Sequence, residues 1–180
     1  LVEDLLDRIL EVMVGISRNL VRLGIDVGYT GDDFGSQRGL LFSPKLWRRL
    51  FRSRYERLWG VFRSAGVPVC HHSCGDVRTI ITEMVEIGLN LLCPVQTHAM
   101  PPDELADKWG EDLAFWGGIC TQSVLPFGSP AEVRDHIEHC RESLGRHGRY
   151  VIGPSHDLTS DVPRENFFAM LDALELDLPR

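Results

Sequence analysis

Apolar residues recur at helical spacing in six stretches of the chain, and local stop and start signals bound several of them. Gly24 ends the first stretch, Ser43 and Pro44 open the second as N-cap and first helical residue, and Ser129 caps the fifth. The pattern predicts helices over residues 1–23, 44–64, 77–87, 103–109, 130–147 and 163–176.

Short, mostly apolar runs alternate with these helices, which favours a parallel sheet with crossover helices. The predicted strands cover residues 25–29, 67–71, 89–95, 113–119 and 150–152. Polar residues gather just after these strands: Asp32, Asp33, His72, Cys74, Gln96, His98, Cys120, Gln122, His156 and Asp157.

An open doubly wound sheet and a (β/α)8 barrel both fit that alternation. A barrel places every strand-end loop on the face where active sites form, whereas an open sheet favours a glycine-rich phosphate loop, and Gly-x-Gly-x-x-Gly is absent. We therefore predict a barrel. A complete one takes about 250 residues, so the 180 residues are expected to form one N-terminally incomplete domain holding its last five βα units.

His72 and Cys74 are the most distinctive pair in the sequence. They stand two residues apart after an apolar run, and alternate residues of an extended strand end face the same side. Imidazole and thiolate are both good zinc ligands, so the spacing favours a metal site. The alternative is a buried histidine beside a cysteine that packs as a small apolar residue.

Composition narrows the possible partners. The net charge of −7 argues against nucleic acid and anionic membrane surfaces. No apolar run approaches the roughly 18 residues of a membrane span, and no signal peptide is recognisable. The five cysteines follow no disulfide-framework spacing, so reduced thiols and a cytoplasmic location are expected.

Several motifs together resemble the uroporphyrinogen decarboxylase superfamily in collinear order over about residues 24–175. They are Gly-Asp-Asp-Phe-Gly at 31–35, Phe-Ser-Pro at 42–44, His-Ser-Cys-Gly at 72–75, Cys-Pro-Val-Gln at 93–96, Trp-Gly-Gly-Ile at 116–119 and Gly-Pro-Ser-His-Asp at 153–157. The resemblance implies a (β/α)8 barrel with one of two activities. One branch decarboxylates the acetate side chains of uroporphyrinogen without a cofactor. The other uses zinc to activate a thiol that accepts a methyl group from a methylated corrinoid protein.

The His-x-Cys element favours the methyltransferase branch, in which such a pair supplies two zinc ligands and a cysteine after the last strand supplies the third. His72 and Cys74 match the pair, but His156 stands where that cysteine is expected. Histidine also ligates zinc, so a site of His72, Cys74 and His156 with one open position is the expectation. The decarboxylase branch also carries a histidine in that loop, so His156 does not separate the branches.

The remaining polar residues have less specific roles. Asp32 and Asp33 are candidates for catalysis, for orienting a ligand or for capping a turn, and Gln96 and Gln122 for binding a small-molecule substrate. Cys120 is a reserve zinc ligand, and the other cysteines (Cys70, Cys93 and Cys140) are expected in the core. The basic helix over 44–64 is expected to have a solvated outer face.

Two alternatives to methyl transfer stay open: tetrapyrrole decarboxylation, and a truncated partial barrel without activity of its own. Five strands cannot close a barrel of eight, so the chain is expected to associate with itself or with a complementing N-terminal fragment.

Overall fold

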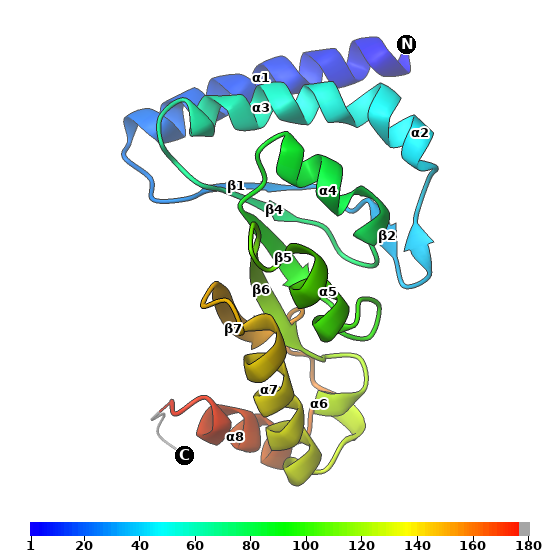
Figure 1. Ribbon diagram of the computed structural model, residues 1–180, viewed down its shortest axis with the longest axis vertical. Coiled ribbons are helices and arrows are strands. Elements are labelled where there is room, and N and C mark those ends of the chain that lie inside the picture. The colour runs from blue at the N-terminus through cyan, green and yellow to red at the C-terminus, as the bar shows by residue number, and fades with distance from the viewer. Residues whose placement is uncertain (177–180) are drawn as a thin grey trace. The chain divides into compact units, whose positions relative to one another are not determined.

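The computed structural model describes residues 1–176 and is an α/β protein in which helices alternate with parallel strands (Figure 1). The larger sheet has five strands in the order β1-β4-β5-β6-β7, and a separate antiparallel pair joins β2 to β3. The predicted alternation of five strands with helices is therefore confirmed. The chain divides into two compact units, Leu1–Leu92 and Cys93–Arg180.

The first unit contains a long N-terminal helix, two strands of the larger sheet, a short hairpin and the helices between them. Its elements are α1 (Val2–Arg22), β1 (Gly28–Gly31), β2 (Gly35–Ser36), β3 (Gly39–Leu40), α2 (Pro44–Trp47), η1 (Arg48–Arg52), α3 (Ser53–Arg63), β4 (Val69–His72) and α4 (Arg78–Glu86). Strand β5 (Leu91–Val95) begins at the end of this unit.

The second unit alternates helices with the last strands. Its elements are α5 (Pro102–Trp109), β6 (Ala114–Ile119), α6 (Val124–Phe127), α7 (Pro130–Leu144), β7 (Tyr150–Pro154) and α8 (Arg164–Ala173). Strands β6 and β7 pair in parallel. Among residues 1–176, no helix has both the length and the apolar character that crossing a membrane requires.

Three local expectations differ from the structure. The helix predicted over 44–64 consists of α2, a π-helical turn over Arg48–Arg52 and α3. The strand predicted over 25–29 lies at Gly28–Gly31, because pairing with β4 begins where the Gly28 N–H donates to the Pro68 carbonyl at 2.9 Å. The β2–β3 pair and α6 were not predicted, since two- and four-residue elements are too short to show a periodicity.

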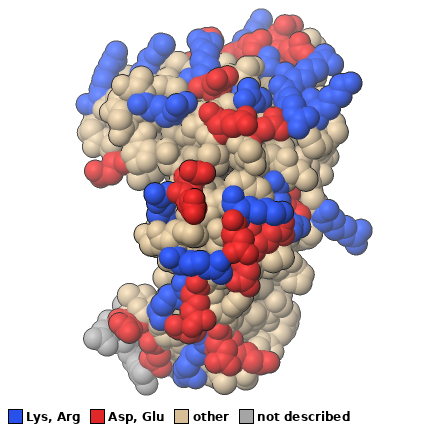
Figure 2. Space-filling model, viewed as in Figure 1, with Lys and Arg blue, Asp and Glu red and all other residues tan. Residues whose placement is uncertain are grey.

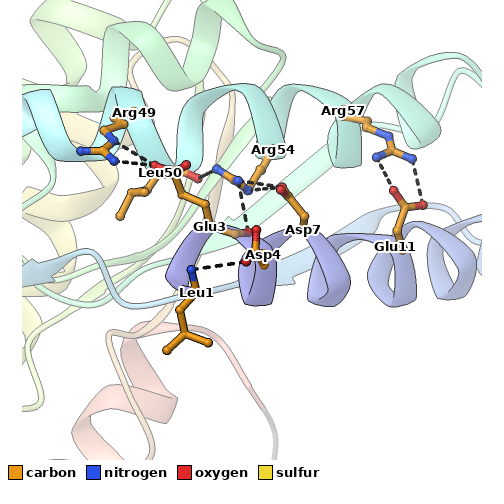
Figure 3. Close-up of polar contacts among 9 residues, drawn as sticks. All are labelled: Leu1, Glu3, Asp4, Asp7, Glu11, Arg49, Leu50, Arg54 and Arg57. Carbon is orange, nitrogen blue, oxygen red and sulfur yellow. Dashed lines mark hydrogen bonds and ion pairs between the residues drawn. The ribbon is translucent and has the colours of Figure 1, made fainter.

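Helix α1 packs on α3 through an apolar face and a row of ion pairs. Leu10, Val14 and Ser17 of α1 are buried, as are large side chains of α3 such as Trp59 and Phe62. At the edge of this contact Figure 3 shows three acidic residues of α1 reaching arginines of the facing helix: Glu3 to Arg49 (2.7 Å), Asp7 to Arg54 (2.6 Å) and Glu11 to Arg57 (2.5 Å). Each exposed pair adds little stability, but together they fix which face of α1 meets α3.

Most positive charges of the helix over 44–64 are paired with acidic residues of the same chain. Besides these three pairs, Arg48 binds Glu83 at 2.7 Å and Arg52 binds Glu86 at 3.2 Å, both acids lying on α4. Figure 2 shows acidic and basic side chains interspersed over the visible face. The expectation of a solvated helix face is refined accordingly: five of its arginines, Arg48, Arg49, Arg52, Arg54 and Arg57, have acidic partners from α1 or α4.

The core of the second unit forms where α7 and α8 pack together. Its buried members are Ile119, Leu125, Val133, Ile137, Ala169, Met170 and Leu171. Helix α7 begins with a capping box, in which the Ser129 side chain accepts from the Glu132 N–H and the Glu132 carboxylate accepts from the Ser129 N–H. The predicted cap at Ser129 is confirmed.

Two glycines allow the loop after β4 to lie directly against β2. A Cβ on Gly75 would stand 2.5 Å from the Gly35 carbonyl carbon, and one on Gly35 would stand 2.6 Å from the Cys74 carbonyl oxygen. Gly75 also has a φ of +78°, which L-residues rarely adopt. The Asp76 N–H donates to the Ser36 carbonyl at 2.8 Å, so this contact holds the loop by backbone alone.

We predict that Gly75→Ala destabilises the protein far more than Gly66→Ala. Gly66 has a similar φ of +73°, but a Cβ added there would meet nothing within 4 Å, so it isolates the cost of the backbone conformation. That cost is about 1–2 kcal/mol, and the backbone clash at Gly75 should bring the total to about 3 kcal/mol. Urea unfolding of both variants measures the difference, and equal losses of stability would contradict the close-approach argument.

Candidate metal centre

The parallel pairing of β1 with β4 brings two polar loops to the same edge of the sheet. Gly31 is in register with His72 at the ends of the two strands. The Asp32 N–H donates to the His72 carbonyl at 3.0 Å and extends the pairing by one bond. The residues that follow, Asp33 on one loop and Cys74 on the other, therefore leave the sheet side by side.

Asp33, His72 and Cys74 form a cluster of three potential metal ligands whose ligand atoms all lie within 4.8 Å of one another. The Cys74 Sγ lies 3.5 Å from the His72 Nε2, and that Nε2 lies 3.6 Å from the Asp33 Oδ1. Bond lengths of about 2.0–2.3 Å at tetrahedral zinc place neighbouring ligand atoms about 3.4–3.6 Å apart. The distances from His72 to Cys74 and from His72 to Asp33 therefore match those between neighbouring ligands of tetrahedral zinc.

The chemistry of the donor set agrees with this spacing. One thiolate, one imidazole and one carboxylate are donors that zinc accepts, and three protein ligands with an open fourth position are typical of catalytic zinc. Thiolate and carboxylate together would balance the charge of a dication, leaving a neutral centre. The pair predicted from spacing, His72 and Cys74, is thus brought together, and Asp33 joins it.

A hollow of about 410 Å³ opens beside the cluster. Its lining consists of Tyr29, Gly31, Asp32, Asp33 and His72. Of the three candidate ligands, Asp33 is exposed while His72 and Cys74 are partly buried. A small molecule in the hollow would therefore reach the imidazole and the carboxylate directly.

The two aspartates have different surroundings. Asp33 accepts the Cys74 backbone N–H at 2.9 Å, which ties the β1 loop to the β4 loop. Asp32 instead accepts a hydrogen bond from the Tyr55 hydroxyl. Burial is the main cause that raises the pKa of Tyr55, and the nearby Asp32 carboxylate raises it further. The phenol therefore keeps its proton and donates it in the hydrogen bond to Asp32. The sequence offers no ground for assigning Asp32 and Asp33 different roles, whereas the structure gives them different hydrogen-bond partners.

His71 lies on the opposite side of β4 from His72 and belongs to the core. Its Nδ1 is 2.9 Å from the Thr30 hydroxyl, which also accepts from the Trp59 indole N–H at 3.0 Å. The ring stacks on Phe34 with centroids 5.3 Å apart. Burial, with the neighbouring His72, lowers the pKa of His71 to about 3, so this imidazole is neutral. Strand alternation could have separated the two histidines from sequence.

The loop that carries Cys74 is fixed by its neighbours as well as by Asp33. The Ser73 hydroxyl accepts the Phe34 N–H at 2.9 Å, and Ser73 is fully buried. Asp76 accepts from the Arg78 side chain at 2.7 Å. Burial opposes ionisation of Asp76, but the hydrogen bonds from Arg78 outweigh it and lower the pKa of the carboxyl. Sequence reasoning did not identify Ser73, Asp76 or Arg78 as supports for the site.

The other predicted site residues belong to the second unit. Gln96 is buried after β5, Gln122 is exposed after β6, and His156 is exposed after β7. Their roles in substrate binding, and that of His156 in catalysis or as a zinc ligand, stay predictions. Asp33 is a further candidate for the third zinc ligand. From the sequence it was predicted only to act in catalysis, to orient a ligand or to cap a turn.

The five cysteines are present as thiols, and Cys70, Cys93 and Cys140 are buried as predicted. Cys120 is also buried and lies 3.2 Å from the Ser123 hydroxyl. Burial raises the pKa of its thiol, but hydrogen bonds from Ser123 and from nearby backbone N–H groups outweigh that effect and lower the pKa.

Comparison with known families supports the resemblance seen in the sequence. The family model for uroporphyrinogen decarboxylase (URO-D) matches residues 1–175. The chain belongs to the uroporphyrinogen decarboxylase family. Among solved structures, a methyltransferase from Methanosarcina mazei is similar, with 21% identity and a TM-score of 0.67. No curated protein matches the chain.

The match covers 92% of this chain but 46% of the Methanosarcina mazei protein, so the chain spans less than half the length of that relative. The predicted fold is confirmed: five parallel strands with their helices correspond to part of a (β/α)8 barrel of the uroporphyrinogen decarboxylase type. In such a barrel the loops after the strands form the active-site face. The cluster of Asp33, His72 and Cys74 follows two neighbouring strands at that face.

We predict that this family member binds about one zinc ion per chain, and that His72→Ala or Cys74→Ser removes most of it. Asp33→Asn should weaken binding at least about tenfold, since it removes the charge of a direct ligand, and loss of even an outer-shell partner costs that much. Elemental analysis after dialysis, followed by competition with a chromophoric chelator, measures stoichiometry and affinity.

The matched control is Cys70→Ser, which removes a buried thiol of the same strand outside the cluster. It should keep its zinc. Comparing His156→Ala with Asp33→Asn distinguishes the two candidates for the third ligand. If the site uses a single third ligand, only one of these substitutions should reduce zinc affinity. Wild-type protein prepared without chelators and free of divalent metal would exclude the site.

Proposed function

We propose that the chain carries the metal-binding half of a zinc-dependent methyltransferase, which moves a methyl group from a methylated corrinoid protein to a thiol. The observation that carries this proposal is the cluster of Asp33, His72 and Cys74, in which the His72 Nε2 lies 3.5 Å from the Cys74 Sγ and 3.6 Å from the Asp33 Oδ1, as neighbouring ligands of tetrahedral zinc do. Membership of the family and the likeness to a methyltransferase support it.

Zinc in this cluster would lower the pKa of an entering thiol and keep it as the nucleophilic thiolate at neutral pH. The side chains of the chain do the rest. His72, as the neutral imidazole, and the anionic Cys74 and Asp33 leave one position for the thiol, and the adjacent hollow admits it from the Asp32 side. Tyr55 holds the Asp32 carboxylate at the wall of this hollow through a hydrogen bond.

The reaction itself is a displacement at carbon. The thiolate sulfur forms a bond to the methyl carbon, the cobalt–carbon bond breaks, and its electron pair remains on cobalt. The thiol proton leaves to solvent on binding, so no side chain needs to donate or accept a proton while the methyl group moves.

Decarboxylation of a tetrapyrrole is the second candidate, because the matching family model is that of uroporphyrinogen decarboxylase. A substrate with many carboxylates needs cationic partners. The described residues that line the hollow include two aspartates and neither lysine nor arginine. A hollow lined in this way suits a thiol better than a substrate with many carboxylates, so it favours methyl transfer over tetrapyrrole decarboxylation.

We predict that the zinc-loaded chain accelerates methyl transfer from methylcobalamin to a small thiol, and that Cys74→Ser lowers the rate at least about tenfold. Loss of a zinc ligand should remove thiolate activation, which is the reason for the expected drop. The change in cobalamin absorbance on demethylation follows the rate, with Cys70→Ser as the control.

Cobalt(II) in place of zinc tests the open position independently of turnover. Added thiol should strengthen the sulfur-to-cobalt charge-transfer absorption in the wild-type chain. A metal-loaded chain whose spectrum ignores added thiol would exclude methyl transfer to a thiol, even if the metal site itself is real.

A further inference from the structure

A cavity of about 160 Å³ lies within the first unit, where α1, the end of β1 and the η1–α3 segment come together. Most of its wall is apolar. The apolar side chains come from α1 (Leu6, Ile9, Leu10 and Met13), from η1 (Phe51) and from α3 (Leu58). Apolar cavities of about 150 Å³ take up a molecule the size of benzene. The space therefore suits a single small ring or a short alkyl chain.

Two charged side chains, Arg54 and Asp32, also line the cavity. Arg54 forms an ion pair with Asp7 at 2.6 Å, and its guanidinium donates to the Leu50 carbonyl at 2.6 Å and to the Glu3 carbonyl at 3.4 Å. The positive charge of Arg54 is therefore compensated within the chain.

The negative charge of Asp32 is not compensated in this way. Its carboxylate accepts a hydrogen bond from the Tyr55 hydroxyl, which is a neutral donor. Among residues 1–176, no lysine or arginine forms an ion pair with Asp32. A carboxylate has about four lone-pair sites, so Tyr55 fixes its position and leaves acceptor capacity for a ligand. A positively charged group there would gain a charge-assisted hydrogen bond.

The exposure of the lining residues shows how a ligand would enter. Leu10, Tyr55 and Leu58 are only 8%, 7% and 6% exposed, whereas Ile9 is 49% exposed and Asp32 lies at the surface. The apolar end of a ligand can therefore lie inside while its charged end stays at the mouth beside Asp32. An apolar pocket with a small number of polar groups is the usual form of a small-molecule site.

The cavity adjoins the candidate metal centre. Gly31 and Asp32 line both this cavity and the hollow beside the metal cluster, which Asp33 and His72 also line. The two spaces thus meet at the Asp32 carboxylate, and an occupant of the cavity would lie next to that hollow.

We propose that this cavity binds a small organic cation: a protonated primary amine carried by one ring or a short alkyl chain, with the ammonium group on Asp32 and the apolar part among the side chains of α1 and α3. This inference depends neither on the zinc site nor on the proposed methyl transfer. A neutral ligand of the same shape lacks the ionic contact, and an anionic one is repelled by the carboxylate.

Calorimetric titration of the full chain with benzylamine, which is protonated at neutral pH, tests the proposal. Benzyl alcohol and benzoate serve as neutral and anionic probes of similar shape. Benzylamine should bind at least about tenfold more tightly than benzyl alcohol, because a hydrogen bond between charged groups is stronger than a neutral one. Benzoate should not bind measurably, and the benzylamine affinity should be the same with and without added zinc.

Two variants separate the contribution of the charge from that of the apolar space. Asp32→Asn should weaken benzylamine binding at least about tenfold and change benzyl alcohol binding by less than about twofold. Met13→Trp places a larger ring in the cavity and should abolish binding of both probes. Asp26→Asn is the matched control, because it removes an exposed carboxylate of the first unit that does not line the cavity. Circular dichroism confirms that each variant folds.

A folded wild-type chain that binds none of the probes overturns the proposal. Equal affinities for benzylamine and benzyl alcohol, or benzylamine binding that survives Asp32→Asn, overturn the role of Asp32. Binding that survives Met13→Trp shows that the probes lie elsewhere and overturns the cavity as the site. Benzylamine binding that requires zinc also overturns the proposal, since the amine then coordinates the metal.

Discussion

The parallel register of β1 with β4 is the constraint on which the candidate metal centre depends. Because Gly31 is in register with His72, the loops after the two strands begin together, and Asp33 meets Cys74 within hydrogen-bonding distance. A slip of one residue would turn His72 toward the core and His71 toward the hollow. The buried environment of His71, packed among Phe34, Tyr55 and Trp59, opposes such a slip.

Much of the fold could be predicted because the long elements carry clear periodicity. The expected helix over 1–23 and the capped helix from 130 appear as α1 and α7, and the five strands follow in the expected order. The π-helical turn at Arg48–Arg52 was not predicted, since a single such turn inside a longer helical pattern is too short to show a periodicity of its own.

The candidate site was predictable only in part. The pair His72 and Cys74 lies within one segment, so spacing along the chain was enough to join them. Asp33 is about forty residues away in sequence, and its place in the cluster depends on strand register, which composition does not reveal. For the same reason the sequence could not distinguish it from Asp32, which the Tyr55 hydroxyl holds instead.

The contact between Gly35 and Gly75 has a mechanical consequence. The hairpin of β2 and β3 touches the β4 loop backbone to backbone, with no side chain between them to absorb a displacement. A movement of the hairpin would therefore pass directly to the Cys74 carbonyl and from there to the thiol. The position of the hairpin and the spacing of the three candidate ligands are therefore linked through this backbone contact.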